Sequence, residues 1–399
     1  MTLDKLTVNE LFSGIGAQRK ALERLGINHE VVGICEIDKY AIQSYEAIFG
    51  ETKNYGDICI VERLDYADLW TYSFPCQDIS VAGKQQGINE NTRSGLLYQV
   101  QRLLEVAKRE KTLPKYLLLE NVKNLVGKQF KEQFFEWIYY LNELGYDTYW
   151  QVLNAKNYGI PQNRERVFAI SIRKDLNQTF EFPQTEELKI RLKDVLEDEV
   201  DEKFYISQDK VQNLIGNFEK IDTEAKIQQV GNYMDTTSFG GNPQCGRVYN
   251  SEGISPTLNT MQGGDRQPKI VIGSTQKNAY IGDGEMSPTL TSAMGMGGGH
   301  VPMVGFDEKI IIDDTQGFDG VRTYENYAPT LRACRSGLKT TDGIRIRKLT
   351  PLECWRLMGF DDEDFYKAQK SGVSNSQLYK QAGNSIVVNV LEKIFKNLF

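Results

Sequence analysis

The sequence predicts an α/β fold, in which a parallel sheet carries helices on both faces and is joined to a smaller β-rich domain. Short β-rich runs alternate with amphipathic helical stretches through residues 1–180, which is the pattern of strand–helix–strand units. From residue 181 the composition shifts to Gly, Asn, Ser, Thr and Pro among short β-like runs. Helical patterning returns near the end of the 399-residue chain, so we expect the last helix to pack on the first domain's sheet.

Hydrophobic periodicity gives the expected elements in order. The strands are Thr7–Phe12, Glu30–Glu36, Leu69–Phe74, Tyr116–Leu119, Thr148–Leu153 and Arg166–Ile172. The helical patterns are Ala17–Leu25, Ala41–Ile48, Leu96–Lys108, Lys131–Leu144, Thr350–Met358 and Val387–Leu398. The expected domains are therefore residues 1–180 completed by 375–399, residues 181–345, and a connecting segment, 346–374.

The middle region contains an irregular repeat. GRVYNSEGISPTL, NAYIGDGEMSPTL and GVRTYENYAPTL end at Leu258, Leu290 and Leu331, with unequal spacing, which argues against a solenoid. Two interpretations stay open. Either the three units build one recognition surface, which we favour because no copy is long enough to be stable alone, or they are stacked units that carry more than one specificity.

Composition excludes several classes of protein. No apolar run is long enough for a membrane helix, and Met1–Glu10 lacks the pattern of a secretory signal, so we expect a cytoplasmic protein. The six cysteines show no CxxC spacing and there are two histidines, which argues against disulfides, a metal site or histidine-based catalysis. The net charge of −7 argues against a generic nucleic-acid binder. However, residues 321–348 are rich in Arg and Lys and predict a basic surface.

A nucleoside pocket is expected at the ends of the first strands. Phe12-Ser13-Gly14-Ile15-Gly16 lies between a strand and a helix, where a tight turn approaches a cofactor. Arg19 replaces the third glycine of the dinucleotide signature, which favours a smaller ligand such as S-adenosylmethionine. Glu36 is placed to accept hydrogen bonds from a ribose diol, and Asp57 is placed to accept one from an adenine amine. The full expected set is Phe12, Gly14, Gly16, Glu36, Ile37, Asp57, Ile58, Pro75, Asn384 and Ser385.

Reactive side chains follow two of the expected strands and lead into a third. Cys76 lies in Phe74-Pro75-Cys76-Gln77, Glu120 begins Glu120-Asn121-Val122, and Arg164 and Arg166 lie in Gln162-Asn163-Arg164-Glu165-Arg166. The carboxyl edge of an α/β sheet is where such enzymes carry out their chemistry. We therefore expect one thiol, one carboxyl and two guanidiniums to converge there.

These motifs, together with Thr350-Pro351-Leu352-Glu353-Cys354 and Gly383-Asn384-Ser385, occur in the order typical of C5-cytosine DNA methyltransferases. The resemblance covers residues 7–172 and 346–399. Glu10, Ala17 and Ser73 depart from it, since Asp, Gly and Gly respectively are usual at those positions.

The resemblance implies a Rossmann-like S-adenosylmethionine-dependent methyltransferase domain, a target-recognition domain at 181–345 and a bracing segment and hinge at 346–374. It implies double-stranded DNA as the substrate. Cys76 resembles the residue that adds to cytosine C6, and Glu120 the carboxyl that contacts N3 and the amine. Arg166 resembles the residue that binds O2 and holds the glutamate, while Arg164 is expected to contact phosphate or a moving loop.

The resemblance also implies DNA contacts. Asp78–Gly95 is expected to form a basic lid over the extruded base, with contacts from Ser80, Lys84 and Arg93. A Thr-Leu pair beside the flipped nucleotide has three candidates, Thr257-Leu258, Thr289-Leu290 and Thr330-Leu331. We favour Thr330, beside Arg332 and Arg335. Gln381–Ser385 is expected to open the last helix, so that the helix N-terminus binds the cofactor's carboxylate.

Three other functions compete with this one. They are an RNA cytosine-C5 methyltransferase of the same fold, a non-catalytic DNA-binding module, and an NAD-dependent oxidoreductase, which the missing third glycine disfavours. The long middle region favours DNA, and the intact reactive residues favour an enzyme. We expect a monomer. The sequence leaves open a separate cognate restriction endonuclease, the target sequence and the number of specificities.

Overall fold

The computed structural model describes residues 5–75, 93–205, 227, 229–232, 246–251, 253–258, 267–272, 275–276, 300–301, 310–313, 322–325, 338–340 and 345–399. The chain divides into two compact units. The first comprises Met1–Ile190, Thr257–Gln262 and Cys354–Phe399, and the second comprises Arg191–Pro256 and Gly263–Glu353. The segment 346–374, expected as a separate part, is thus divided between the two units.

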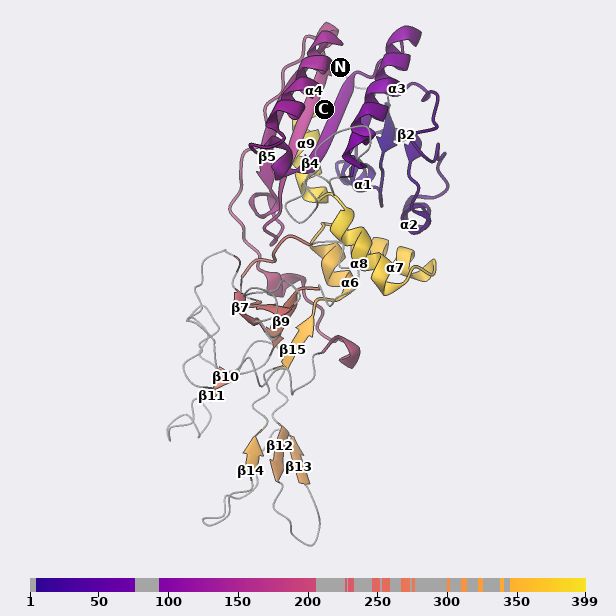
Figure 1. The fold of residues 1–399 in the computed structure, drawn as a ribbon. Helices are drawn as coiled ribbons and strands as arrows, with labels where there is room; N and C mark the ends of the chain where they lie inside the picture. The colour runs from indigo at the N-terminus through magenta and orange to yellow at the C-terminus, as the bar shows by residue number, and fades with distance from the viewer. Residues whose placement is uncertain are drawn as a thin grey trace. The chain divides into compact units, whose positions relative to one another are not determined.

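The first unit is built on a six-stranded sheet with the order β2-β1-β3-β4-β6-β5 (Figure 1). Its strands are β1 (Leu6–Leu11), β2 (His29–Cys35), β3 (Leu69–Tyr72), β4 (Tyr116–Val122), β5 (Tyr146–Asn154) and β6 (Glu165–Arg173). All six predicted strands are confirmed, with ends shifted by a few residues. The sheet is parallel from β2 to β4, as predicted, but β6 runs antiparallel to both β4 and β5. The connection between β5 and β6 is too short for the crossover that parallel strands need.

Helices cover both faces of this sheet (Figure 1). They include α1 (Ala17–Arg24), α2 (Lys39–Phe49), α3 (Leu97–Glu110), α4 (Lys131–Glu143) and α9 (Val388–Leu398). Helix α9 contacts α1, and Phe399 makes an edge contact with Tyr116 of β4 at a ring-centroid distance of 5.2 Å. The end of the chain therefore packs on the sheet formed by its beginning.

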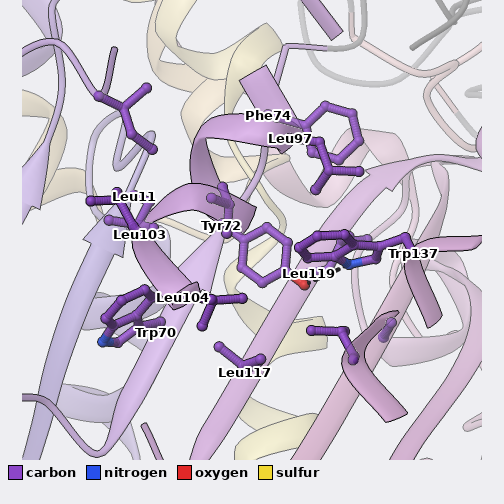
Figure 2. Close-up of a cluster of buried hydrophobic side chains, with 14 of the residues drawn as sticks. Leu11, Trp70, Tyr72, Phe74, Leu97, Leu103, Leu104, Leu117, Leu119 and Trp137 are labelled. Carbon is purple, nitrogen blue, oxygen red and sulfur yellow. Dashed lines mark hydrogen bonds between the residues drawn. The ribbon is translucent and has the colours of Figure 1, made fainter. Parts of the chain in front are cut away.

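A hydrophobic cluster fills the space between the sheet and helices α3 and α4 (Figure 2). Trp70 and Tyr72 of β3 alternate with side chains on the opposite face, as the strand period requires, and Trp137 of α4 donates a 3.1 Å hydrogen bond to the Tyr72 hydroxyl. The packed members include Leu11, Leu97, Leu103, Leu104, Leu117 and Leu119. This core holds the strand ends that carry the candidate site.

The C-terminal region contains α6 (Pro351–Arg356), α7 (Asp362–Lys370) and α8 (Asn375–Asn384) before α9. Helices α7 and α8 were not predicted from the sequence. The expectation that Gln381–Ser385 opens the last helix is wrong: these residues end α8, Ser385 is its extended C-cap, and α9 begins at Val388. Single-turn helices lie at Arg93–Leu96, Lys123–Val126, Ala155–Tyr158, Lys174–Leu176, Leu192–Val195 and Glu202–Phe204.

The second unit is rich in strands, as predicted. One sheet has the order β15-β9-β8-β7 and another the order β13-β12-β14, and β10 pairs with β11. The bounds are β7 (Gln229–Asn232), β8 (Arg247–Tyr249), β9 (Lys269–Ile272), β10 (Thr275–Gln276), β11 (His300–Val301), β12 (Ile310–Asp313), β13 (Arg322–Glu325), β14 (Leu338–Thr340) and β15 (Arg345–Lys348). Within the described ranges, every helix is too short or too polar to cross a membrane.

Arg347 corrects the prediction of a basic surface over residues 321–348. Its side chain is 1% exposed and makes a two-pronged ion pair with Glu353, at 2.8 and 2.6 Å. The Glu353 carboxylate also accepts hydrogen bonds from the backbone N–H groups of Thr350 and Glu197. Arg347 therefore stabilises the interior of the second unit rather than adding to its surface charge.

Candidate active site

A cavity of about 310 Å³ opens at the carboxyl ends of β1 to β4, within the first unit. Ligands of α/β proteins bind at this edge of the sheet, and the volume is within the range of small-molecule sites. Three of the four predicted catalytic residues line the cavity, Glu120, Arg164 and Arg166. The predicted cofactor residues that line it are Phe12, Gly14, Glu36, Ile37, Asp57, Ile58, Pro75, Asn384 and Ser385.

The turn after β1 is held by the carboxylate of Glu36. One carboxylate oxygen accepts from the backbone N–H of Gly14 at 2.9 Å, and the other accepts from Ile37 at 2.9 Å and Asp38 at 2.8 Å. Phe12, with a φ of 59°, and Gly14, with a φ of 56°, adopt the left-handed conformation that makes the turn tight. Glu36 is therefore fixed at the cavity wall with lone pairs left for a ribose diol.

Gly16, another residue of the predicted cofactor set, does not line the cavity. It precedes α1 with a φ of 78°. A Cβ atom at this position would lie 2.5 Å from the Phe49 ring and 2.7 Å from the Tyr45 ring. Gly16 is therefore needed for the turn and for close packing against α2.

Two further features fit a nucleoside ligand. The Ser13 side chain is 4% exposed and lines the cavity, and its hydroxyl has no hydrogen-bond partner among the described residues. Buried hydroxyls are normally paired, so this one is available to a bound molecule. Ile37 is 72% exposed at the cavity wall, where an apolar side chain can cover a flat base. The sequence prediction missed Ser13 although it lies inside the quoted motif.

Glu120 and Arg166 form the polar pair at the end of β4 and the start of β6. Arg166 Nε lies 3.2 Å from Glu120 Oε1, and the Glu120 side chain is 9% exposed. Burial raises the pKa of Glu120, although Arg166 and Arg164 both act to lower it. A carboxyl group in this position is poised to take up a proton while its orientation stays fixed by the guanidinium.

Arg164 has a different surrounding from the one expected. It is buried, and its guanidinium donates to the carbonyl oxygens of Leu258 at 3.0 Å, Gly383 at 3.0 Å and Ser385 at 2.7 Å. The expected contact with DNA phosphate or a moving loop is therefore replaced by a positioning role. Arg164 joins the segment before β6 to the end of α8 and to the short segment at Leu258.

The segment that leads to Cys76 is held at the sheet edge by Asn121, whose side-chain amide donates to the Phe74 carbonyl at 3.0 Å. Pro75, the last described residue before Cys76, lines the cavity. Cys76, Ser80, Lys84, Thr330, Arg332 and Arg335 lie outside the described residues. Of Arg93 only the backbone is described, at the start of a single-turn helix.

Thr257-Leu258, the first of the three Thr-Leu pairs, belongs to the first unit. The Thr257 hydroxyl donates to the Asn163 carbonyl at 2.6 Å, and the Leu258 N–H donates to Gln162 Oε1 at 3.2 Å. The amide nitrogen of Gln162, Nε2, donates to the Leu357 carbonyl at 2.7 Å. These contacts hold Thr257 and Leu258 against the Gln162–Arg166 segment, whereas Thr330 lies outside the described residues.

Lys380 is another lining residue that the sequence prediction missed. Its ammonium lies 2.6 Å from the Asp38 carboxylate, which caps α2 through the Tyr40 N–H. Gln381 binds the Tyr40 carbonyl at 2.8 Å and the Ser44 hydroxyl at 3.0 Å. These contacts hold α8 against the start of α2 and so complete the cavity wall.

Known proteins share the sequence pattern and the fold of this chain. The orphan methyltransferase M.SPRI of Bacillus phage SPR is 36% identical, over 99% of this chain and 98% of the relative. The type II methyltransferase M.HhaI of Haemophilus parahaemolyticus is 32% identical, over 98% of this chain and 93% of the relative. The fold is shared with the solved methyltransferase EhMeth of Entamoeba histolytica, with a TM-score of 0.61 and 16% identity, covering 99% of this chain and 98% of that one. The family model described as C-5 cytosine-specific DNA methylase matches residues 6–399, so the chain belongs to that family.

Proposed function

We propose that the protein transfers a methyl group from S-adenosylmethionine to C5 of an extruded cytosine in a specific duplex DNA sequence. Members of its family are enzymes that use this methyl donor. The observation that carries the proposal is one cavity that holds both a nucleoside-binding turn and the Glu120–Arg166 pair. A cofactor and a base bound there would lie next to each other, as methyl transfer requires.

The cofactor site is the part of the cavity formed by the turns after β1 and β2. Glu36 would accept from the ribose hydroxyls, Ile37 would cover the adenine, and the free Ser13 hydroxyl would bind a polar group of the ligand. Lys380 adds a positive charge at the wall. When bound, S-adenosylmethionine supplies the electrophilic methyl group.

The reacting base would be activated by Cys76, which follows Pro75. Its thiolate adds to C6, a C–S bond forms, and the π electrons of the C5–C6 bond make C5 nucleophilic. Glu120 holds the ring through N3 and the amine, and its proton offsets the negative charge that develops there. After C5 is methylated and loses its proton, the electron pair of that C–H bond restores the double bond and expels the thiolate.

Cys35 lines the same cavity and needs to be distinguished from Cys76. Burial, together with the nearby carboxylates of Glu36 and Asp57, raises the pKa of Cys35 to about 12. At neutral pH this thiol is protonated and therefore a weak nucleophile. This supports the assignment of the covalent role to Cys76.

DNA recognition is assigned to residues 181–345, which lie mostly in the second unit. Side chains from this region would contact base edges in the major groove. We assign the position beside the extruded nucleotide to Thr257-Leu258, because Gln162 and Arg164 fix its backbone in the first unit. Ser80, Lys84 and Arg93 remain the proposed DNA contacts of the lid. We propose that the protein acts as a cytoplasmic monomer and that any cognate endonuclease acts separately.

The test combines an assay of methyl transfer with an assay that traps the covalent complex between the protein and DNA. Labelled S-adenosylmethionine is supplied with duplex DNA or transfer RNA, and bisulfite sequencing then locates the modified cytosines. We expect transfer to DNA at one sequence context. Transfer to RNA alone would support the RNA methyltransferase, and no transfer to either substrate would support a binding module.

The covalent step is tested with duplex DNA that carries 5-fluorocytosine at the located site. The parent protein should form a complex that resists denaturation, and Cys76→Ser should not. Cys59→Ser is the matched control, because Cys59 is an exposed thiol outside the cavity. A complex that persists in Cys76→Ser would show that another group forms the bond.

A further inference from the structure

Ser73 lies at the carboxyl end of β3, beside the carboxyl group of the candidate site. Strands β3 and β4 are parallel neighbours with Tyr72 opposite Leu119, so the next residues along, Ser73 and Glu120, are also neighbours. One residue further, the Asn121 amide donates to the Phe74 carbonyl at 3.0 Å, which keeps the two segments together beyond the strands. Ser73 and Glu120 both line the cavity.

The Ser73 hydroxyl oxygen is buried and has no hydrogen-bond partner among the residues described. A buried hydroxyl without a partner is costly and is usually retained for a reason. Burial raises the pKa of Glu120, and a hydrogen bond from the Ser73 hydroxyl would lower it, in the same direction as Arg166 and Arg164.

We propose that Ser73 is a positioning residue for Glu120. Its hydroxyl donates to the carboxylate while Glu120 is ionised and gives up that bond when Glu120 takes up a proton to bind the base. Ser73 would thereby limit how far burial favours the protonated carboxyl, and so keep both protonation states accessible. This inference rests on the proposed function, in which Glu120 contacts the extruded cytosine.

The charged surroundings of Glu120 allow the contribution of Ser73 to be isolated. Arg166 contacts the carboxyl from β6, and Arg164 lies before that strand. The remaining ionisable side chains of the cavity wall, among those described, are Cys35, Glu36, Asp38, Asp57 and Lys380. Ser73→Ala leaves all of these charges in place, so a change in Glu120 titration would report the hydroxyl alone.

The first experiment is independent of activity. The protein is labelled with ¹³C at the glutamate carboxyl groups, and the Glu120 signal is assigned by its loss in Glu120→Gln. In Ser73→Ala we expect the titration of Glu120 to move upward by about one pH unit, the size expected for the loss of one hydrogen bond to a charged group. Ser73→Thr, which keeps a hydroxyl, should titrate close to the parent. An unchanged Glu120 titration in Ser73→Ala would overturn the proposal.

The second experiment connects Ser73 to the reaction. If protonated Glu120 is required, the rate of single-turnover methylation of duplex DNA falls at alkaline pH. In Ser73→Ala this alkaline limb of the pH–rate profile should shift to higher pH. Ser13→Ala, a change in the cofactor part of the cavity, should weaken cofactor binding and leave the limb in place. If the Glu120 signal shifts but the parent does not methylate DNA, the proposed function fails while the Ser73–Glu120 relationship stands. If the parent methylates DNA and the limb does not move in Ser73→Ala, Ser73 is not a positioning residue.

Discussion

The Tyr45 hydroxyl donates a 2.6 Å hydrogen bond to the carboxylate of Glu10 in the interior of the first unit. Glu10 has no exposed surface, and its other oxygen accepts from the Arg19 N–H in the first turn of α1. Burial raises the pKa of Glu10 to about 7, although Tyr45 and Arg19 act to lower it. A carboxyl group that titrates near neutrality is thus built into β1, at a position outside the cavity.

Glu10 predicts a dependence of folding stability on pH. Below pH 4.5, the ordinary pKa, both folded and unfolded chains carry the proton, and between 4.5 and about 7 only the folded chain keeps it. The contribution of Glu10 to stability is therefore greatest at low pH, falls through this window, and levels off above it, by roughly 3 kcal/mol in total. Glu10→Gln should flatten the profile in urea denaturation, whereas Glu51→Gln, at an exposed site, should not. Equal slopes for Glu10→Gln and the parent would contradict the prediction.

Arg166 is predicted to control both the orientation and the ionisation of Glu120. Because its guanidinium lies 3.2 Å from the carboxyl, Arg166→Met should raise the pKa of Glu120 and loosen its position. We expect single-turnover methylation to fall by about 10²-fold or more, the range of a general acid–base contribution, with cofactor affinity little changed. Lys123→Met is the control, since Lys123 pairs with exposed Glu165 on the neighbouring strand. A parallel loss of cofactor binding in Arg166→Met would point to a collapsed cavity instead.

The three Thr-Leu pairs are predicted to differ in importance. Thr257→Val removes the hydroxyl that binds Asn163, and we expect weaker DNA binding and slower methylation with unchanged cofactor affinity. Thr289→Val and Thr330→Val are the matched variants, and both should stay close to the parent at the same DNA sequence. DNA affinity is measured by fluorescence anisotropy at constant salt, because the phosphate contribution depends on salt. A loss confined to Thr330→Val would restore the choice made from the sequence.

The Arg347–Glu353 ion pair is predicted to stabilise the second unit. Glu353→Ala leaves the Arg347 guanidinium, which is 1% exposed, without its partner. We expect this loss to lower the free energy of unfolding by about 3–5 kcal/mol. Denaturant unfolding checks this value, and cofactor binding to the first unit should persist under native conditions. Glu199→Gln, at an exposed position of the same unit, should change stability little. A small effect of Glu353→Ala would mean that water reaches Arg347 and replaces the carboxylate.

Local patterns in the sequence were sufficient for much of the site. The period of hydrophobic residues fixed the six strands, and the polar residues that follow them were expected at one sheet edge, where Glu36, Glu120 and Arg166 line one cavity. Such predictions succeed because the hydrophobic period and the alternation of side chains along a strand are local properties. The reversed direction of β6 was missed, since pairing between distant strands leaves no local signal.

The sequence by itself determined the family motifs, the strand positions and the identity of the reactive groups. Tertiary structure decided which partners those groups have. Arg164 was expected to contact phosphate or a moving loop but binds three carbonyls, Arg347 was counted as surface charge but is buried, and Thr257 binds Asn163 within the first unit. A charged side chain is the same in sequence whether it meets water, a carboxylate or a carbonyl, and only the packing of distant segments selects among them.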